Sequence, residues 1–438
     1  MITVARLLRG LLPVLAAGAA GVVTALPAAS QPVTRADQWW LGALHLPAAL
    51  TGAPAAGRGV TVAVLSTGVD AGHPDLTGRV TAGPDFGPTG RSAAGPYWGD
   101  EGTAVASLIA GHGHGRGGAE GITGIAPGAR ILSVPVTLEY NNPRNADAAV
   151  TRRLPAAIAA GIRYAAGHGA TVIALPLDPG TLGPAVAGGP GAAGGSAAER
   201  AAVSFALGHG VLLIAPAGDN GAGTNAVNYP AAYPGVIAVG ATARNGQLAP
   251  FTAVRSYVAL TAPGSGGTLA AGEPGGTLAG LGSGGLTAAA PGGGYQSLAS
   301  SDMSAALTAG VAALIRSRYP RLTVPEVTQA LERGVAAPGS GTAQPAGDGR
   351  GHGALDAATA LTAAAAIAAA HPAPAPSSGP SSASASPPRS VFTGPALRPP
   401  PRPPDPGRLL RTLVAGLAVT AGVLIIVLAS AITLIRLR

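Results

Sequence analysis

Short uninterrupted apolar runs alternate with longer alanine-rich segments through the middle of the chain. The apolar runs are rich in β-branched residues and lie at 60–65, 129–136, 171–177, 211–215 and 236–241. Such runs are typical of strands that are buried on both faces of a parallel sheet. Helical segments fall between or after them, at 103–110, 156–166, 197–207 and 303–318. The alternation predicts an α/β fold, a doubly wound parallel sheet with helices on both faces.

This fold class also predicts where functional side chains should lie. Ligands of doubly wound sheets bind outside the carboxyl ends of the strands. The residues that directly follow the apolar runs are therefore the candidate functional residues of this chain.

The first 30 residues have the pattern of a secretory signal peptide. Arg6 and Arg9 precede an apolar run at 11–23, and small residues follow at 25–30. This order of charged, apolar and small residues is typical of a cleaved signal. An uncleaved N-terminal membrane anchor is the alternative, because a cleavage site is hard to locate in so alanine-rich a segment.

A second apolar segment near the C-terminal end predicts a transmembrane helix. Residues 412–435 are 24 consecutive residues without a charge, and as a helix they would extend over about 36 Å, enough to cross a bilayer core. A buried helix of a soluble domain is the alternative. Before this segment, 372–407 contains 13 prolines in 36 residues, a composition typical of an extended stalk.

Together these segments predict four parts: a signal peptide at 1–30, a globular domain at 31–371, a proline-rich stalk at 372–407 and an anchor with a short tail at 408–438. Because a signal peptide directs the chain outward, we expect the globular domain outside the cell membrane. The C-terminus is then cytoplasmic after a single membrane pass, and Arg436 and Arg438 agree with the positive-inside rule.

The charge distribution excludes nucleic-acid binding. The formal net charge is +8, and every cationic residue other than histidine is an arginine. The excess lies at the two ends, because 35–371 contains 18 arginines and 18 acidic residues. A nucleic-acid-binding domain is expected to be basic, and this one has no net charge. The chain contains no cysteine, which excludes disulfides, thiolate metal sites and a cysteine nucleophile.

The segments at the predicted strand ends resemble those of subtilisin-like serine proteases. The resemblance is carried, in chain order, by TVAVLSTGVDAGHPDL at 61–76, EGTAVASLIAGHGHG at 101–115, ITGIAPGARILSVPV at 122–136, LLIAPAGDNG at 212–221, YPAAYPGVIAVGAT at 229–242, SSDMSAALTAGVAALI at 300–315 and GHGALDAATAL at 351–361. The order and spacing agree over more than half of the chain. The resemblance implies the subtilisin fold and its peptidase site.

Within that family the chain resembles the mycosins, membrane-anchored proteases of actinobacterial type VII secretion systems. DQWWLGALHLPAAL at 37–50 is similar to their opening segment. A signal, a peptidase-type domain, a proline-rich stalk and one anchor also match their layout. The resemblance implies a membrane-bound secretion complex as the partner.

The resemblance places other residues at all three positions of the catalytic triad. The family's aspartate motif D-T-G reads Ser66-Thr67-Gly68 here, and its histidine motif H-G-T reads Glu101-Gly102-Thr103. Its nucleophile motif G-T-S-M-A is matched by residues 300–304, which puts Asp302 in place of the serine. A triad needs a hydroxyl nucleophile and an imidazole base, and neither residue type stands at its position.

Two further positions depart from the family pattern. The oxyanion asparagine is matched by Asp219, a carboxylate where the chemistry needs a hydrogen-bond donor. The S-L-G of the substrate strand is matched by Pro176, Leu177 and Asp178, and a proline has no N–H to offer a peptide. Five departures beside intact scaffold motifs predict a catalytically inactive protein.

Neighbouring residues are not expected to replace the missing groups. Asp70 lies four residues beyond Ser66 in the turn. His112 and His114 lie at the far end of the predicted helix, about 15 Å from its start, and are predicted to be solvated loop residues. Ser301 adjoins Asp302, but adjacent helical residues point in different directions, so Ser301 is interpreted as the helix N-cap.

Two alternatives involve the carboxylates themselves. Serine-carboxyl peptidases share the fold and use a glutamate base and an oxyanion aspartate, which Glu101 and Asp219 resemble. That family, however, keeps its serine and adds an aspartate where this chain has Val105. Alternatively, Glu101, Asp219 and Asp302 could converge and, with Ser66, hold Ca²⁺ or Mg²⁺. Otherwise Glu101 and Asp302 are solvated carboxylates at helix N-termini, where the helix dipole favours them.

The sequence therefore predicts an inactive mycosin-like module on the outer face of the membrane, with no cofactor, which binds a peptide ligand or a secretion complex. An active serine-type or serine-carboxyl endopeptidase that processes secreted proteins is the alternative. The residue at 302 separates the two predictions, because hydrolysis by this fold needs a hydroxyl there.

Overall fold

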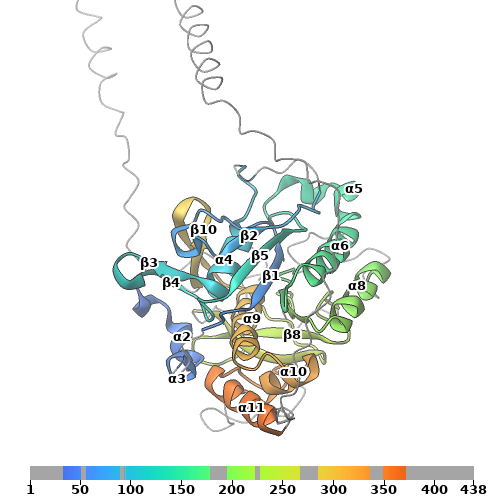
Figure 1. The fold of residues 1–438 in the computed structure, drawn as a ribbon. Coiled ribbons are helices and arrows are strands. Elements are labelled where there is room, and N and C mark those ends of the chain that lie inside the picture. The colour runs from blue at the N-terminus through green and yellow to red at the C-terminus, as the bar shows by residue number, and fades with distance from the viewer. Residues whose placement is uncertain are drawn as a thin grey trace, which may run out of the picture. The chain divides into compact units, whose positions relative to one another are not determined.

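The computed structural model describes residues 33–50, 56–88, 93, 95–177, 195–221, 227–266, 285–335 and 349–370. Their central feature is a seven-stranded sheet with the order β2-β5-β1-β6-β7-β8-β9, in which all neighbouring strands are parallel (Figure 1). Its strands are β1 (Thr61–Ser66), β2 (Val80–Ala82), β5 (Arg130–Pro135), β6 (Val172–Ala174), β7 (Leu212–Pro216), β8 (Val236–Ala243) and β9 (Val258–Ser265). This confirms the predicted α/β fold with a parallel sheet.

Two small hairpins and a set of helices complete the described part. The hairpins pair β3 (His112–His114) with β4 (Glu120–Thr123), and β10 (Leu286–Ala290) with β11 (Gly294–Leu298). The α-helices are α2 (Trp39–Ala43), α3 (Leu46–Leu50), α4 (Asp100–Ala110), α5 (Ala148–Thr151), α6 (Leu154–Gly167), α8 (Ala197–Gly208), α9 (Ser301–Arg318), α10 (Val324–Arg333) and α11 (Ala357–Ala370). Short 3₁₀ turns are η1 (Arg35–Asp37), η2 (Pro74–Leu76), η3 (Arg116–Gly118), η4 (Pro143–Ala146) and η5 (Pro291–Gly293).

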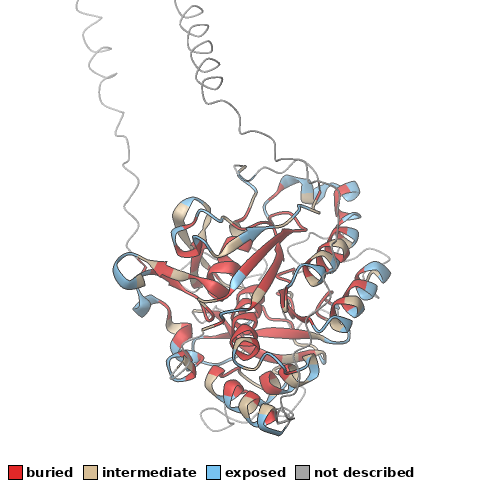
Figure 2. Cartoon of the chain, in the orientation of Figure 1, coloured by how far each residue is buried: buried red, intermediate tan, exposed pale blue. Residues whose placement is uncertain are grey.

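Helices cover both faces of the sheet because successive strand residues point to opposite sides. In β1, Val62 and Val64 belong to the core that α4, α9, α10 and α11 complete. Ala63 and Leu65 belong instead to the core beneath α6 and α8. Burial on both sides explains why the strand sequences are continuously apolar, and Figure 2 shows buried residues along the strands and in α9.

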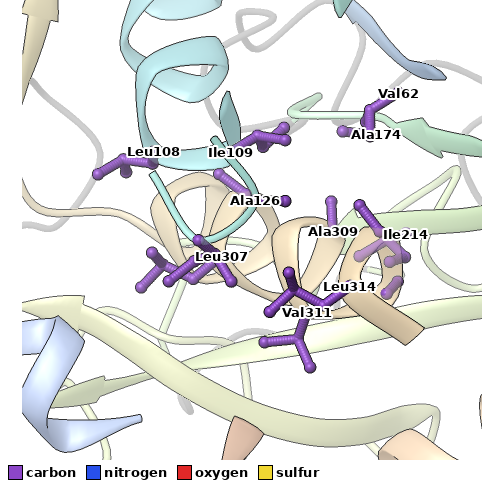
Figure 3. Packing of buried hydrophobic residues seen from close by; sticks show 14 of the residues in the cluster. Val62, Leu108, Ile109, Ala126, Ala174, Ile214, Leu307, Ala309, Val311 and Leu314 are labelled. Carbon is purple, nitrogen blue, oxygen red and sulfur yellow. The ribbon is translucent and has the colours of Figure 1, made fainter. Parts of the chain in front are cut away.

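Helix α9 lies in the interior of the domain. Sixteen of its 18 residues are buried, and it packs against strands β6 to β9 and against α4. Figure 3 shows Leu307, Val311 and Leu314 of α9 among side chains of the sheet and of α4. A Cβ at Gly310 would collide with Ile125, so the lack of a side chain at this position lets the helix approach closely.

The strand and helix ranges agree with the sequence predictions over most of the sheet, and β6 is the clearest difference. The apolar run at 171–177 yields only the strand Val172–Ala174, because Pro176 has no N–H for a ladder and the Leu177 N–H turns back to the Leu175 carbonyl. The edge strand β9, the two hairpins, and helices α10 and α11 were not predicted. In β9, Pro263 and Gly264 interrupt the apolar pattern.

Within the described ranges, no helix is both long enough and apolar enough to cross a membrane. The predicted signal peptide, stalk and transmembrane segment lie outside these ranges, so their assignments remain predictions.

Candidate functional site

Ser66 and Glu101 meet at the carboxyl edge of the sheet. Ser66 is the last residue of β1 and is fully buried, and Glu101 lies in the first turn of α4. The Ser66 hydroxyl donates a hydrogen bond to Glu101 Oε2 at 2.8 Å. The structure thus brings into contact two of the residues that the sequence predicted for the site.

Two glycines allow the segments that carry Ser66 and Glu101 to approach each other closely. A Cβ at Gly102 would collide with the Gly68 carbonyl oxygen, and the Trp98 indole occupies the space where a Cβ of Gly68 would lie. Gly68 also has a φ of +124°, a conformation that residues with a side chain rarely adopt. The turn after β1 and the start of α4 are therefore in direct backbone contact.

Glu139, which sequence reasoning missed, caps the helix that carries Glu101. The N-cap residue of α4 is Gly99, which has no side chain to cap the helix. Instead, Glu139 Oε1 accepts a hydrogen bond from the Asp100 N–H at 2.7 Å. Burial raises the pKa of the Glu139 carboxyl, and the nearby Asp100 carboxylate raises that pKa further. The available signal was an acidic residue four positions after a buried strand.

Asp219 and Asp302 lie at the N-terminus of α9. Asp302 is the second residue of this helix and is only 2% exposed. Asp219 follows β7, is 6% exposed, and its Oδ1 accepts a hydrogen bond from the Ser301 N–H at 2.9 Å. The Asp219 carboxylate thereby satisfies a backbone donor of the first turn of α9.

The interpretation of Ser301 as an N-cap is wrong by one residue. The N-cap is Ser300, whose side chain makes no capping hydrogen bond. Ser301 begins the helix, and its Oγ accepts a hydrogen bond from the Gly218 N–H at 3.3 Å. Ser301 and the segment after β7 therefore exchange two hydrogen bonds, which fixes Asp219 beside the start of α9.

The predicted substrate strand is described only in part. Pro176 and Leu177 follow β6 and are both buried, and Asp178 lies outside the described residues. The alternative of a calcium site is not supported. Among the residues that the structure describes, no group of three or more His, Asp or Glu side chains is close enough to hold a metal ion. Glu101, Asp219 and Asp302 do not converge in the way that a calcium site requires.

The residues that were considered as replacements for the missing catalytic groups make other contacts. The Asp70 carboxylate accepts hydrogen bonds from the N–H groups of Gly72 and Gly292, at 2.8 and 2.9 Å. His112 and His114 belong to β3 instead of a solvated loop. This corrects the prediction for both histidines and leaves the role of Asp70 structural.

His114 pairs with a carboxylate that sequence reasoning did not single out. Its Nδ1 lies 2.6 Å from Oδ1 of Asp75, which is fully buried. Asp75 Oδ2 also accepts hydrogen bonds from the Ile122 N–H at 2.7 Å and from the Tyr295 hydroxyl at 3.0 Å. The Asp75 carboxylate thus joins η2, the β3–β4 hairpin and the β10–β11 hairpin.

Removal of the Asp219 side chain should destabilise the start of α9. For Asp219→Ala we expect the free energy of unfolding to fall by about 1–2 kcal/mol, the usual cost of losing a helix cap. Asp219→Asn keeps an oxygen acceptor and should cost less. Denaturant unfolding of the three proteins measures this difference. Equal losses for the two variants would contradict the capping role.

Comparison with known proteins supports the arrangement of these segments. Residues 57–353 match the subtilase family model. Thermostable alkaline protease of Halalkalibacterium halodurans is 31% identical over 277 residues, which cover 63% of this chain and 62% of that protein. Thermitase of Thermoactinomyces vulgaris is 32% identical over 265 residues, which cover 60% of this chain and 77% of that protein. The chain thus spans less than two thirds of the alkaline protease.

Among solved structures, the MycP3 protease from the type VII (ESX-3) secretion system is similar to this chain with 26% identity and a TM-score of 0.55. The superposition covers 74% of this chain and 87% of MycP3. The family match extends over more than half of the chain and includes β1, α4, β7 and the whole of α9. This chain therefore belongs to the subtilase family.

Proposed function

We propose that this chain is a membrane-anchored, extracytoplasmic mycosin-like protein that does not hydrolyse peptides. In this proposal the subtilase domain serves as a structural or binding module of a type VII secretion system. The observation that carries the proposal is the Ser66–Glu101 hydrogen bond. It supports the match of Ser66 and Glu101 to the positions where the family's mechanism needs a carboxylate and an imidazole, because it joins a hydroxyl donor to a carboxylate acceptor instead.

The chemistry of the other positions supports inactivity. Hydrolysis by a subtilase requires a hydroxyl nucleophile whose proton passes to a neighbouring imidazole. Position 302 carries a carboxylate, and the acid at position 101 already accepts a hydrogen bond from the Ser66 hydroxyl. Asp219 is a further acceptor, and a negative charge there opposes the negative charge that develops on the substrate oxygen.

The likeness to MycP3 supports the secretion-system part of the proposal. MycP3 is a protease from a type VII secretion system, and most of its length superposes on this chain. The N-terminal residues 37–50, which resemble the opening segment of mycosins, also pack into the domain, with Trp40 and Leu44 fully buried. A protease-shaped domain in such a complex can hold partners together without cutting them.

An activity measurement on the full chain in detergent tests the proposal. We expect no product from peptide substrates between about pH 4 and pH 9, a range that covers the usual acid and base catalysts. We also expect no labelling by serine-directed phosphonates, with thermitase as the positive control. Hydrolysis, or labelling that is lost on substitution of one particular serine, would instead establish the alternative, an active serine-type or serine-carboxyl endopeptidase.

A further inference from the structure

Three parallel strands begin at one edge of the sheet with an arginine at or shortly before the first residue of each. Arg79 precedes β2, Arg130 begins β5, and Arg58 lies three residues before β1. The backbones of these positions are in contact, because the Ile131 N–H donates to the Arg79 carbonyl and the Arg130 N–H donates to the Val60 carbonyl, both at 2.9 Å. The three arginines therefore lie at the same amino edge of the sheet.

The end of α9 brings two more arginines to this edge. The Ser317 hydroxyl donates a hydrogen bond to the Arg58 carbonyl at 2.7 Å. Arg318 follows Ser317 directly, and Arg321 lies three residues after Arg318. We call Arg58, Arg79, Arg130, Arg318 and Arg321 together the basic edge. Four of the five are exposed and Arg79 is half-buried.

No ion pair between a member of the basic edge and a carboxylate occurs within the described ranges. The first acidic residue after Arg321 in the chain is Glu326. It accepts hydrogen bonds from the Thr323 N–H and hydroxyl at the start of its own helix. Arg316 contrasts with the basic edge, because it is buried and donates to the carbonyls of Leu322 and Gly210.

Acidic residues gather at the opposite edge. Those that follow strand ends or begin helices at the carboxyl edge include Asp70, Asp100, Glu101, Glu139, Asp219 and Asp302. The balanced count of arginines and acids in the domain therefore does not exclude a local patch of one sign, and the basic edge is such a patch. A surface with one sign of charge attracts a polyanionic partner even when the whole domain is neutral.

We propose that the basic edge docks on the anionic phospholipid headgroups of a membrane. Guanidinium groups bind phosphates well because several planar donors fit the phosphate oxygens. The partner is argued from the chain itself, because the uncharged segment 412–435 would tether the domain to a bilayer through the stalk, and tethering strengthens a weak contact. This inference rests on the proposed membrane anchoring. It orients the Ser66–Glu101 site away from the bilayer.

The absence of cysteine permits a direct test with the full chain. A single cysteine in Pro320→Cys, an exposed position between Arg318 and Arg321, carries a donor fluorophore that is attached after reconstitution into vesicles. Headgroup-labelled lipid is the acceptor. We expect at least about twofold more energy transfer with about 30 mol % phosphatidylglycerol than with phosphatidylcholine alone, and loss of the difference at about 0.5 M salt.

Charge-matched variants locate the contact. The difference should disappear when three members of the basic edge are replaced together, as Arg58→Ser, Arg79→Ser and Arg130→Ser. It should persist when three exposed arginines beyond the carboxyl end of β5 are replaced, as Arg144→Ser, Arg152→Ser and Arg153→Ser. Equal effects of the two sets would overturn the proposal, as would equal transfer in both kinds of vesicle, the result expected if the edge serves an acidic protein.

Flotation distinguishes this failure from that of the anchoring proposal. If the chain does not float with phosphatidylcholine vesicles, the proposed anchor is wrong and the basic edge has no tethered membrane to meet. If the chain floats and the transfer does not depend on phosphatidylglycerol, the anchor stands and the docking surface is wrong.

Discussion

A chain that combines Ser66→Asp, Glu101→His, Asp219→Asn and Asp302→Ser should hydrolyse an activated peptide ester at least about 10³-fold faster than the unmodified chain, because a triad and an oxyanion donor each contribute factors of this size or larger. Residues 66 and 101 already lie within hydrogen-bond distance of each other, and α9 already holds position 302 at its first turn. On the proposed equivalence of these positions, the four side chains suffice for hydrolysis of an activated ester, since the backbone that carries them is present.

The control for this gain is the triple variant that keeps Asp302. It carries the aspartate, histidine and asparagine but no hydroxyl at position 302, and it should remain at the background rate. Circular dichroism and melting of all three proteins separate loss of fold from loss of chemistry. If the quadruple variant folds and still hydrolyses nothing, the matched positions are not equivalent to a triad. The proposal of a substituted site then fails.

The second large effect concerns Glu199, a buried acid of α8 that lies outside the candidate site. Glu199 is 5% exposed, and its Oε2 accepts a hydrogen bond from the Tyr233 hydroxyl at 2.8 Å. Burial raises the pKa of this carboxyl to about 7, although the hydrogen bond from Tyr233 opposes the shift. Protonated Glu199 is therefore favoured in the folded chain, whereas the unfolded chain releases this proton near pH 4.5.

The sign of the pH dependence follows from these two pKa values. Below the unfolded value both states are protonated, and this group causes no loss of stability. As pH rises from about 4.5 to about 7, the free energy of unfolding falls by an amount on the order of 3 kcal/mol. A glutamine at position 199 cannot ionise. The free energy of unfolding of Glu199→Gln, relative to that of the unmodified chain, should therefore increase by this amount between pH 4.5 and pH 8.

Denaturant unfolding of the full chain in detergent at the two pH values measures this change. Glu120→Gln is the matched control, because the side chain of Glu120 is 54% exposed, whereas Glu199 is buried. A stability difference between Glu199→Gln and the unmodified chain that stays constant from pH 4.5 to pH 8 would contradict the assignment.

The sheet could be predicted from sequence because burial on both faces leaves an uninterrupted apolar run. The runs that became β1, β5, β7 and β8 have this property. Strand β9 was not predicted because Pro263 and Gly264 interrupt its apolar run. Both residues are tolerated in β9 because it is an edge strand. The hairpin strands β10 and β11 are short and rich in small or polar residues, so their sequences resemble loops.

The positions of the site residues were predictable, and their contacts were not. The motifs around Ser66, Glu101 and Asp302 located each residue at a strand end or a helix start. That Glu139 caps α4 and that Asp219 caps α9 depends on which segments meet at the carboxyl edge, and spacing along the chain does not encode such meetings. The pairing of His114 with Asp75 has the same origin, because 39 residues separate them.

The burial of α9 constrains when the chain can fold. This helix begins at residue 301, yet its neighbours include strands formed more than a hundred residues earlier. Strands β6 to β9 leave one face exposed to water until α9 covers it, so a chain that emerges from its N-terminus has no complete core before residue 318 at the earliest. Contacts of such long sequence separation form slowly. If the domain is exported as an extended chain, most of that chain can therefore cross the membrane unfolded. The domain becomes compact only after α9 has emerged.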